Sequence, residues 1–166
     1  MIIYIKNKYT LKIDNLKFKC SVGRNGFSKT KIEGDKKTPK GTFEIQHLYY
    51  REDRLKKPIT RLKCIKIKKQ MGWCNDIRNP KKYNKLINVK NDSSIRHEKV
   101  YRKDFKYDLL IPIKYNFKKP TIGRGSCIFI HLTKTYKPTA GCISLGKKDL
   151  LIILKLINKK TKIKIN

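Results

Sequence analysis

Two side chains in the C-terminal third of the chain have the types and spacing that cysteine-dependent acyl transfer requires. His131 ends an apolar run, and Cys142 follows eleven positions later in the turn Thr-Ala-Gly-Cys. A thiol becomes a nucleophile when it loses its proton, and a neighbouring imidazole can accept that proton. Because glycine lets the backbone turn sharply, the N–H groups of Gly141 and Cys142 can point at one position, as in an oxyanion hole. A structural interpretation stays open, since cysteine is also a common small buried residue.

The other four cysteines form no pattern of a second site. Cys20, Cys64, Cys74 and Cys127 are interpreted as packing residues. An odd number of cysteines in a chain without an export signal favours free thiols over a disulfide framework. No Cys-x-x-Cys or His-x-x-x-His spacing occurs, so we expect neither a metal site nor a cofactor.

The net charge of +31 would suit a polyanion-binding protein, but the composition argues against specific nucleic-acid recognition. The chain has 35 Lys and only 8 Arg, and Lys, Ile and Asn make up 69 of its 166 residues. This skew is typical of an AT-rich genome, whereas a protein selected to bind phosphates is expected to use more arginine for its bidentate geometry. We therefore expect non-specific, salt-sensitive adhesion to polyanions and no specific nucleic-acid partner.

The hydropathy pattern predicts one mainly-β domain over residues 1–166. Alternating apolar residues predict a hairpin that includes residues 3–5 and 11–13, and further strands over 16–22, 42–50, 62–68 and 161–165. The apolar runs 107–116 and 126–132 are typical of strands buried on both faces. Residues 31–41 and 69–107 are predicted to be loops, and only 147–160 has convincing helical spacing. The expected architecture is a sandwich or partly open barrel with one C-terminal helix.

No segment has the length of a transmembrane helix. The apolar run LLIIL at 150–154 is far too short to cross a bilayer. The first residues, MIIYIKNKY, lack the apolar stretch and the cleavage site of a signal peptide. The sequence as given therefore predicts a cytoplasmic location, or a periplasmic or envelope location if its start is incomplete or export uses another route.

Several separated motifs, in a fixed order, resemble one family. The segment 131–145 resembles the active-site signature of the L,D-transpeptidase catalytic domain (YkuD type), in which a strand-end histidine precedes Ser/Thr-x-Gly-Cys and a hydrophobic residue. SVGRNGFSKTKIEGDKKTPKGTFEI resembles the N-terminal half of that family, with its Gly-Arg-x-Gly turn, its Gly-Asp and its Thr-Pro-x-Gly-x-Phe. MGWCNDIRNPKKYNKLI, RHEKVYRKDFKYDLLIPIKYN and GRGSCIFIH are similar to stretches of a compact branch without accessory domains. The resemblance covers about residues 18–157.

The resemblance implies a reaction and the roles of particular residues. Cys142 would be the acyl-accepting nucleophile, His131 its general base, and the Leu132 carbonyl the group that orients the imidazole. The implied substrates are peptidoglycan stem peptides: the thiolate attacks the carbonyl of an L-centred residue, expels the terminal D-residue and forms a thioester that an amine acceptor resolves. If water resolves the thioester, the protein is an L,D-carboxypeptidase.

Two departures from the family pattern affect the same turn. Ala140 stands where the commoner motif has histidine, and the interval between His131 and Cys142 is shorter than in the best-known members. Given Ala140, a catalytically silent wall-binding relative remains an alternative function. A polyanion-binding module whose Lys-rich strands bind the ligand is the other alternative.

Cationic, aromatic and polar residues in the matching segments are the predicted substrate contacts, because arginine in particular suits the carboxylates of stem peptides. The candidates are Arg24, Trp73, Tyr83, Asn84, Arg96, His97, Tyr115, Asn116, Arg124 and Thr139. The alternative is that the arginines are solvated or cap turns and that the aromatic residues anchor the core.

Overall fold

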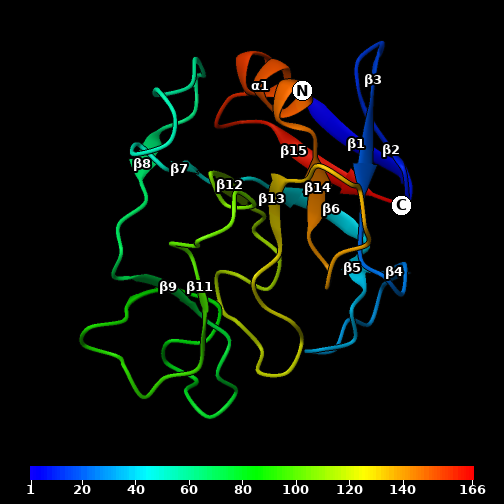
Figure 1. Ribbon diagram of the computed structural model, residues 1–166. Helices are drawn as coiled ribbons and strands as arrows, with labels where there is room; N and C mark the ends of the chain where they lie inside the picture. Colours follow the sequence, from blue (N-terminus) through cyan, green and yellow to red (C-terminus); the bar gives the residue numbers. More distant parts are fainter.

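Ten strands form one long sheet in the computed structural model, which describes residues 1–166 (Figure 1). The strand order is β6 (Gly41–Glu44), β15 (Lys162–Ile165), β1 (Ile2–Asn7), β2 (Thr10–Ile13), β3 (Leu16–Ser21), β14 (Ile143–Leu145), β13 (Phe129–Leu132), β12 (Leu109–Pro112), β7 (Leu48–Tyr50) and β8 (Cys64–Lys66). A second sheet has the order β10 (Leu86–Asn88), β9 (Met71–Cys74), β11 (His97–Lys99), and β4 (Phe27–Ser28) pairs with β5 (Thr38–Pro39). The mainly-β prediction is confirmed.

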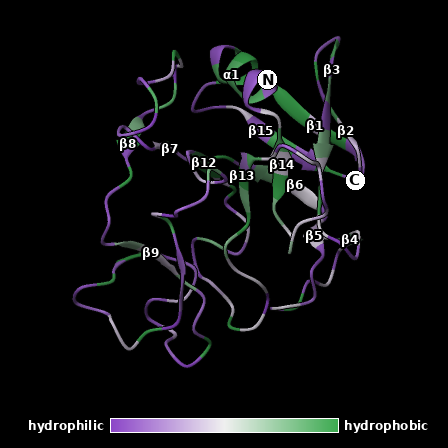
Figure 2. Ribbon diagram, viewed as in Figure 1, coloured by the Kyte–Doolittle hydropathy of each residue, from purple (hydrophilic) through white to green (hydrophobic).

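The period-two pattern of the terminal strands places one face of the long sheet in the core. Ile3 pairs with Ile13 and Ile5 with Leu11, and all four side chains are fully buried. The single helix, α1 (Lys147–Leu156), packs its buried residues into the same cluster. Figure 2 shows these hydrophobic residues gathered in the strands and α1, whereas the loops around β9 are mostly hydrophilic. Full burial of each such side chain contributes about 1.5–3 kcal/mol to folding.

The sheet curls until its first strand approaches its eighth. Ile45, directly after β6, forms an isolated antiparallel bridge with Ile113, directly after β12. The Lys114 N–H donates to the Glu44 carbonyl at 2.8 Å, and the Gln46 N–H donates to the Pro112 carbonyl at 2.9 Å. These bonds close one corner of the curled sheet, as expected of a partly open barrel.

Three predicted elements differ from the structure for local reasons. The single strand predicted over 42–50 is divided into β6 and β7, because the chain leaves β15 at this corner to pair with β12. The helix predicted over 147–160 ends at Leu156, because the Asn158 side chain accepts the Lys160 N–H and starts a turn. The strand predicted over 126–132 begins only at Phe129, since Cys127 has a φ of 55°.

The segments predicted to be loops contain short strands that are too brief to show a period. Residues 69–107 contribute the whole three-stranded sheet, in which Trp73 of β9 pairs with Leu86 and Glu98 on either side. Residues 31–41 contribute β5, which pairs with β4. No helix in the structure is long and apolar enough to cross a membrane.

Candidate active site

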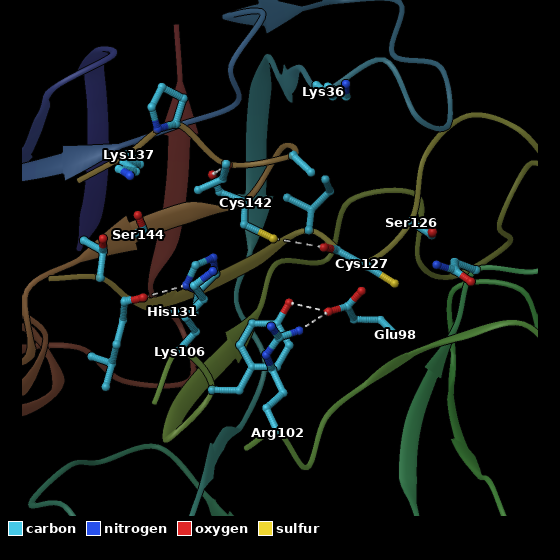
Figure 3. Close-up of a pocket in the computed structure, with 18 of the residues that line it drawn as sticks. Lys36, Glu98, Arg102, Lys106, Ser126, Cys127, His131, Lys137, Cys142 and Ser144 are labelled. Atoms are coloured by element: carbon cyan, nitrogen blue, oxygen red, sulfur yellow. Dashed lines mark hydrogen bonds and ion pairs between the residues drawn. The ribbon is translucent and has the colours of Figure 1, made fainter. Parts of the chain in front are cut away.

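A cavity of about 520 Å³ holds both predicted catalytic side chains (Figure 3). His131 lies in β13, and Cys142 directly precedes β14. The two strands are parallel neighbours, with Ile130 opposite Ile143 and His131 opposite Ser144. This pairing brings two residues that are eleven positions apart into one cavity.

The turn that carries Cys142, the predicted nucleophile, is held by the hydrogen bonds of one hydroxyl group. The Thr139 hydroxyl donates to the Cys142 carbonyl at 2.6 Å and accepts the Gly141 N–H at 3.1 Å. Gly141 has a φ of 138°, and a Cβ at this position would lie 2.9 Å from the Lys37 carbonyl oxygen, so only glycine fits. Of the two N–H groups predicted for the oxyanion hole, that of Gly141 is therefore engaged within the turn. The Cys142 N–H donates to no acceptor.

The Thr-Pro-x-Gly motif near the N-terminus supports the same turn. Thr38 is fully buried, and its hydroxyl donates to the Gly141 carbonyl at 2.9 Å while accepting the Gly23 N–H at 2.8 Å. A Cβ on Gly23 would lie 2.5 Å from the Lys36 carbonyl oxygen, so this crossing also requires glycine. The separated motifs of the sequence thus meet at the backbone of the nucleophile turn.

His131 is oriented as a base. Its Nδ1 lies 2.9 Å from the Leu132 carbonyl oxygen, as the resemblance predicted. Because a carbonyl oxygen only accepts hydrogen bonds, Nδ1 carries the proton and Nε2 keeps its lone pair. Nε2 has no hydrogen-bond partner, and the Cys142 thiol donates instead to the Cys127 carbonyl at 3.2 Å. The thiol must rotate to reach the imidazole, and such bonds often form only with substrate in place.

Burial keeps both reacting groups neutral. It raises the pKa of Cys142 to about 12, although a hydrogen bond from the Phe129 backbone opposes this shift. Burial also lowers the pKa of His131 to about 4. At neutral pH the resting pair is therefore a thiol and an uncharged imidazole, and proton transfer must accompany the attack of the sulfur on a carbonyl carbon.

Charged residues line the cavity unequally. The cations are Lys31, Lys36, Arg102, Lys106 and Lys137, and the acids are Glu33 and Glu98. Lys31 is paired with Asp35 at 2.6 Å, and Arg102 is paired with Glu98 and Asp104. The other three lysines form no ion pair, so they can attract an anionic ligand.

Several predicted substrate contacts lie behind the cavity wall instead of in it. Asn84 is 4% exposed, and its carboxamide oxygen accepts the Trp73 indole N–H at 3.0 Å and the Cys127 N–H at 3.1 Å. Its amide group donates to the Tyr115 and Asn116 carbonyls. With an exposure of 4%, Asn84 has little surface to offer a ligand, and it positions the segment that leads to Cys127.

Tyr83, Tyr115 and Asn116 form hydrogen bonds that hold the same segment in place. Tyr83 is fully buried, and its hydroxyl and that of Ser126 donate to one oxygen of Glu33. Tyr115 donates to the Arg124 carbonyl at 2.6 Å, and Asn116 donates to the Gly125 carbonyl at 2.9 Å. These residues position the wall of the cavity.

The remaining predicted contacts are distributed around the molecule. Thr139 lines the cavity, but its hydroxyl is engaged in the turn. Arg24, Arg96 and Arg124 are exposed, and none of them lines the cavity. His97 lines a separate cavity, with its Nδ1 at 2.7 Å from the Ile95 carbonyl oxygen.

Sequence reasoning missed four residues that line the cavity beside His131 and Cys142. Glu98, Arg102, Lys106 and Tyr107 fall in a segment whose resemblance was noted, but no spacing singled them out. Cys127, interpreted as a packing residue, also lines the cavity and offers its carbonyl to the nucleophile. No group of three or more His, Cys, Asp or Glu side chains is arranged to hold a metal ion.

Comparison with known proteins places this chain in a family. No curated protein is significantly similar to the chain. Among solved structures, an L,D-transpeptidase from Mycobacterium smegmatis aligns with 99% of this chain and 57% of its own length, at 14% sequence identity and a TM-score of 0.39. The chain therefore spans little more than half of that protein. The model of the YkuD family, the L,D-transpeptidase catalytic domain, matches residues 1–165. The chain belongs to this family, whose general reaction is cysteine-dependent acyl transfer.

Proposed function

We propose that the protein transfers acyl groups between peptidoglycan stem peptides through a thioester on Cys142. The observation that carries the proposal is the shared cavity of Cys142 and His131, in which the imidazole is fixed with its Nε2 lone pair free. The chain's family membership supplies the class of substrate. The unpaired lysines of the lining support it, because stem peptides end in carboxylates.

The first half of the reaction follows from the positions of these groups. Nε2 of His131 takes the proton of Cys142 as the sulfur attacks the carbonyl of an L-centred residue. The unpaired N–H of Cys142 is placed to donate to the oxyanion that develops. His131 then returns the proton to the departing amine of the D-residue. The thioester remains for an acceptor.

Intact-protein mass spectrometry with a tetrapeptide stem and with a carbapenem tests the assignment. The wild-type protein should release the terminal D-residue and gain one carbapenem adduct on Cys142. Cys142→Ala should abolish both reactions, and His131→Ala should slow turnover by about 10²–10⁴-fold. Release of the D-residue by Cys142→Ala would show that the nucleophile is wrong.

The alternative functions predict different outcomes. A silent wall-binding relative would bind peptidoglycan without forming any adduct. A polyanion-binding module would show steeply salt-dependent binding that survives Cys142→Ala. An L,D-carboxypeptidase would use water as its only acceptor and form only the hydrolysed stem peptide, whereas a transpeptidase would incorporate an added amine.

A further inference from the structure

We propose that Glu98 selects a positively charged amine as the acceptor in the second half of the reaction. The inference rests on the function proposed above and assigns to it a specificity-determining residue. Glu98 lies in β11 and lines the cavity that holds Cys142 and His131. Its side chain is 31% exposed, so a ligand can reach it.

Only one oxygen of the Glu98 carboxylate is used within the protein. Oε1 accepts hydrogen bonds from Arg102 at 3.0 Å and from the Tyr107 hydroxyl at 3.1 Å, whereas Oε2 accepts none. Arg102 does not need the charge of Glu98, because its other two nitrogens already form a bidentate pair with Asp104 at 2.9 and 2.6 Å. The three charges of Glu98, Arg102 and Asp104 sum to −1, which leaves one negative charge facing the cavity.

The charged residues of the lining lie at different places around Cys142. In Figure 3, Lys106 and Lys137 lie on the His131 side of Cys142, Lys36 lies apart from them at the top of the view, and Glu98 lies across from His131, next to Cys127 and Arg102. A substrate that brings carboxylates suits the lysine side. An ammonium group suits the Glu98 side, which belongs to the same cavity as Cys142.

The negative charge is unfavourable for the first half of the reaction. Burial is the largest cause of the raised pKa of Cys142, and the negative charge of Glu98 raises it further. This charge therefore opposes formation of the thiolate. A site built only to form the thioester would be better without it. An acceptor ammonium neutralises this charge when it binds, and Glu98 then contributes to the step in which the thioester is resolved.

The chemistry of that step is complete with the groups present. After the first half His131 is neutral again, so its Nε2 can take one proton from the bound ammonium. The freed amine forms a C–N bond with the thioester carbonyl carbon, and the C–S bond breaks. The proton on His131 passes to the departing sulfur, which restores the thiol. The nitrogen releases its second proton to water, so the products are a neutral amide, the thiol and one proton. Water competes for the same thioester, but it carries no net charge for Glu98 to attract.

Glu98→Gln tests the assignment, because glutamine keeps the size of the side chain and an oxygen that can accept from Arg102 and Tyr107. The thioester is formed from a tetrapeptide stem and offered the ammonium of Nα-acetyl-lysine amide or uncharged hydroxylamine. The variant should lower the ratio of lysine amide to hydrolysis product by about tenfold or more. The ratio of hydroxamate to hydrolysis product should change less than about twofold. Asp104→Asn is the matched control, because it removes an equal negative charge that is paired with the same side chain, Arg102.

A binding measurement in the Cys142→Ala background does not depend on turnover. Nuclear magnetic resonance titration should show binding of Nα-acetyl-lysine amide weakened by about tenfold in Glu98→Gln, with no effect on the Nε-acetylated analogue. An unchanged affinity, or an equal loss in Asp104→Asn, would overturn the proposal. If the wild-type protein forms no thioester, the proposed function fails, and this titration alone decides whether Glu98 binds an ammonium group.

Discussion

Lowering the pH from 7.5 to 4.5 is expected to destabilise the folded protein through His131. The imidazole is only 7% exposed, and burial lowers its pKa from the usual 6.5 to about 4. In the unfolded chain the pKa returns to about 6.5. Between these two values the unfolded state binds a proton that the folded state excludes. Stability contributed by the neutral histidine is therefore lost as the pH falls from 6.5 towards 4.

The size of the loss follows from the two pKa values. At pH 4.5 about 99% of unfolded imidazoles but only about a quarter of folded ones carry the proton. This difference corresponds to about 2.5 kcal/mol of unfolding free energy, and at pH 7.5 the corresponding difference is close to zero. Lys106 and Arg102 also lower the pKa of His131, so the effect should be larger at low ionic strength.

Urea unfolding of the wild-type protein and of His131→Asn at both pH values measures this contribution. Asparagine can still donate a hydrogen bond to the Leu132 carbonyl, and other titrating groups contribute equally to both proteins. The wild-type protein should lose about 2.5 kcal/mol more than the variant between pH 7.5 and 4.5. Equal losses would refute the reasoning, because they would mean that His131 titrates alike in the folded and unfolded states.

Two further predictions concern the nucleophile turn. At pH 7.5 iodoacetamide should alkylate Cys142 about a hundredfold more slowly than free cysteine, because burial raises the pKa of Cys142 to about 12 and few of its thiols are ionised. A more basic thiolate is also more nucleophilic, but this offsets only part of the lost ionisation. Peptide mass spectrometry measures this rate, and alkylation as fast as that of free cysteine would contradict it. Thr139→Val should slow acylation of Cys142 about tenfold, since the Gly141 N–H and the Cys142 carbonyl each lose a partner, whereas Thr139→Ser should keep most of the rate. Stopped-flow acylation by a carbapenem compares the two variants, and equal rates would exclude a role for the hydroxyl.

The larger part of the fold could be predicted because its strands carry clear periods. The alternation of Ile3, Ile5, Leu11 and Ile13 is directly visible in the sequence, and the structure buries all four. The three-stranded sheet could not be predicted, because each of its strands has only three or four residues and mixed polarity. The corner after β6 was also missed, because residues 42–50 have the composition of one strand and a change of pairing partner within them leaves no signal in the sequence.

The candidate site was predictable where backbone geometry dictates the residue type. Glycine before Cys142 is required by a positive φ and a close carbonyl, and the sequence shows both the glycine and the cysteine. Glu98 and Arg102 were missed because their role depends on lying in one cavity with His131 and Cys142, which are distant in the chain, and spacing does not encode this. Trp73 and Asn84 were chosen for their chemistry, but that chemistry is used inside the protein, where each satisfies the other.

The absence of a second histidine in the turn makes the direction of proton movement unusually simple. Ala140, which lines the cavity, carries no group that can accept a proton, and His131 contributes the only imidazole of the lining. In the proposed mechanism, Nε2 of His131 carries the proton between Cys142 and the leaving amine, and later the proton between the acceptor and the sulfur. A site with one imidazole benefits from a separate group that binds the acceptor, because His131 cannot both bind the acceptor amine and deprotonate it. In our proposal, the free oxygen of Glu98 supplies that positioning by attracting the charged form of the acceptor.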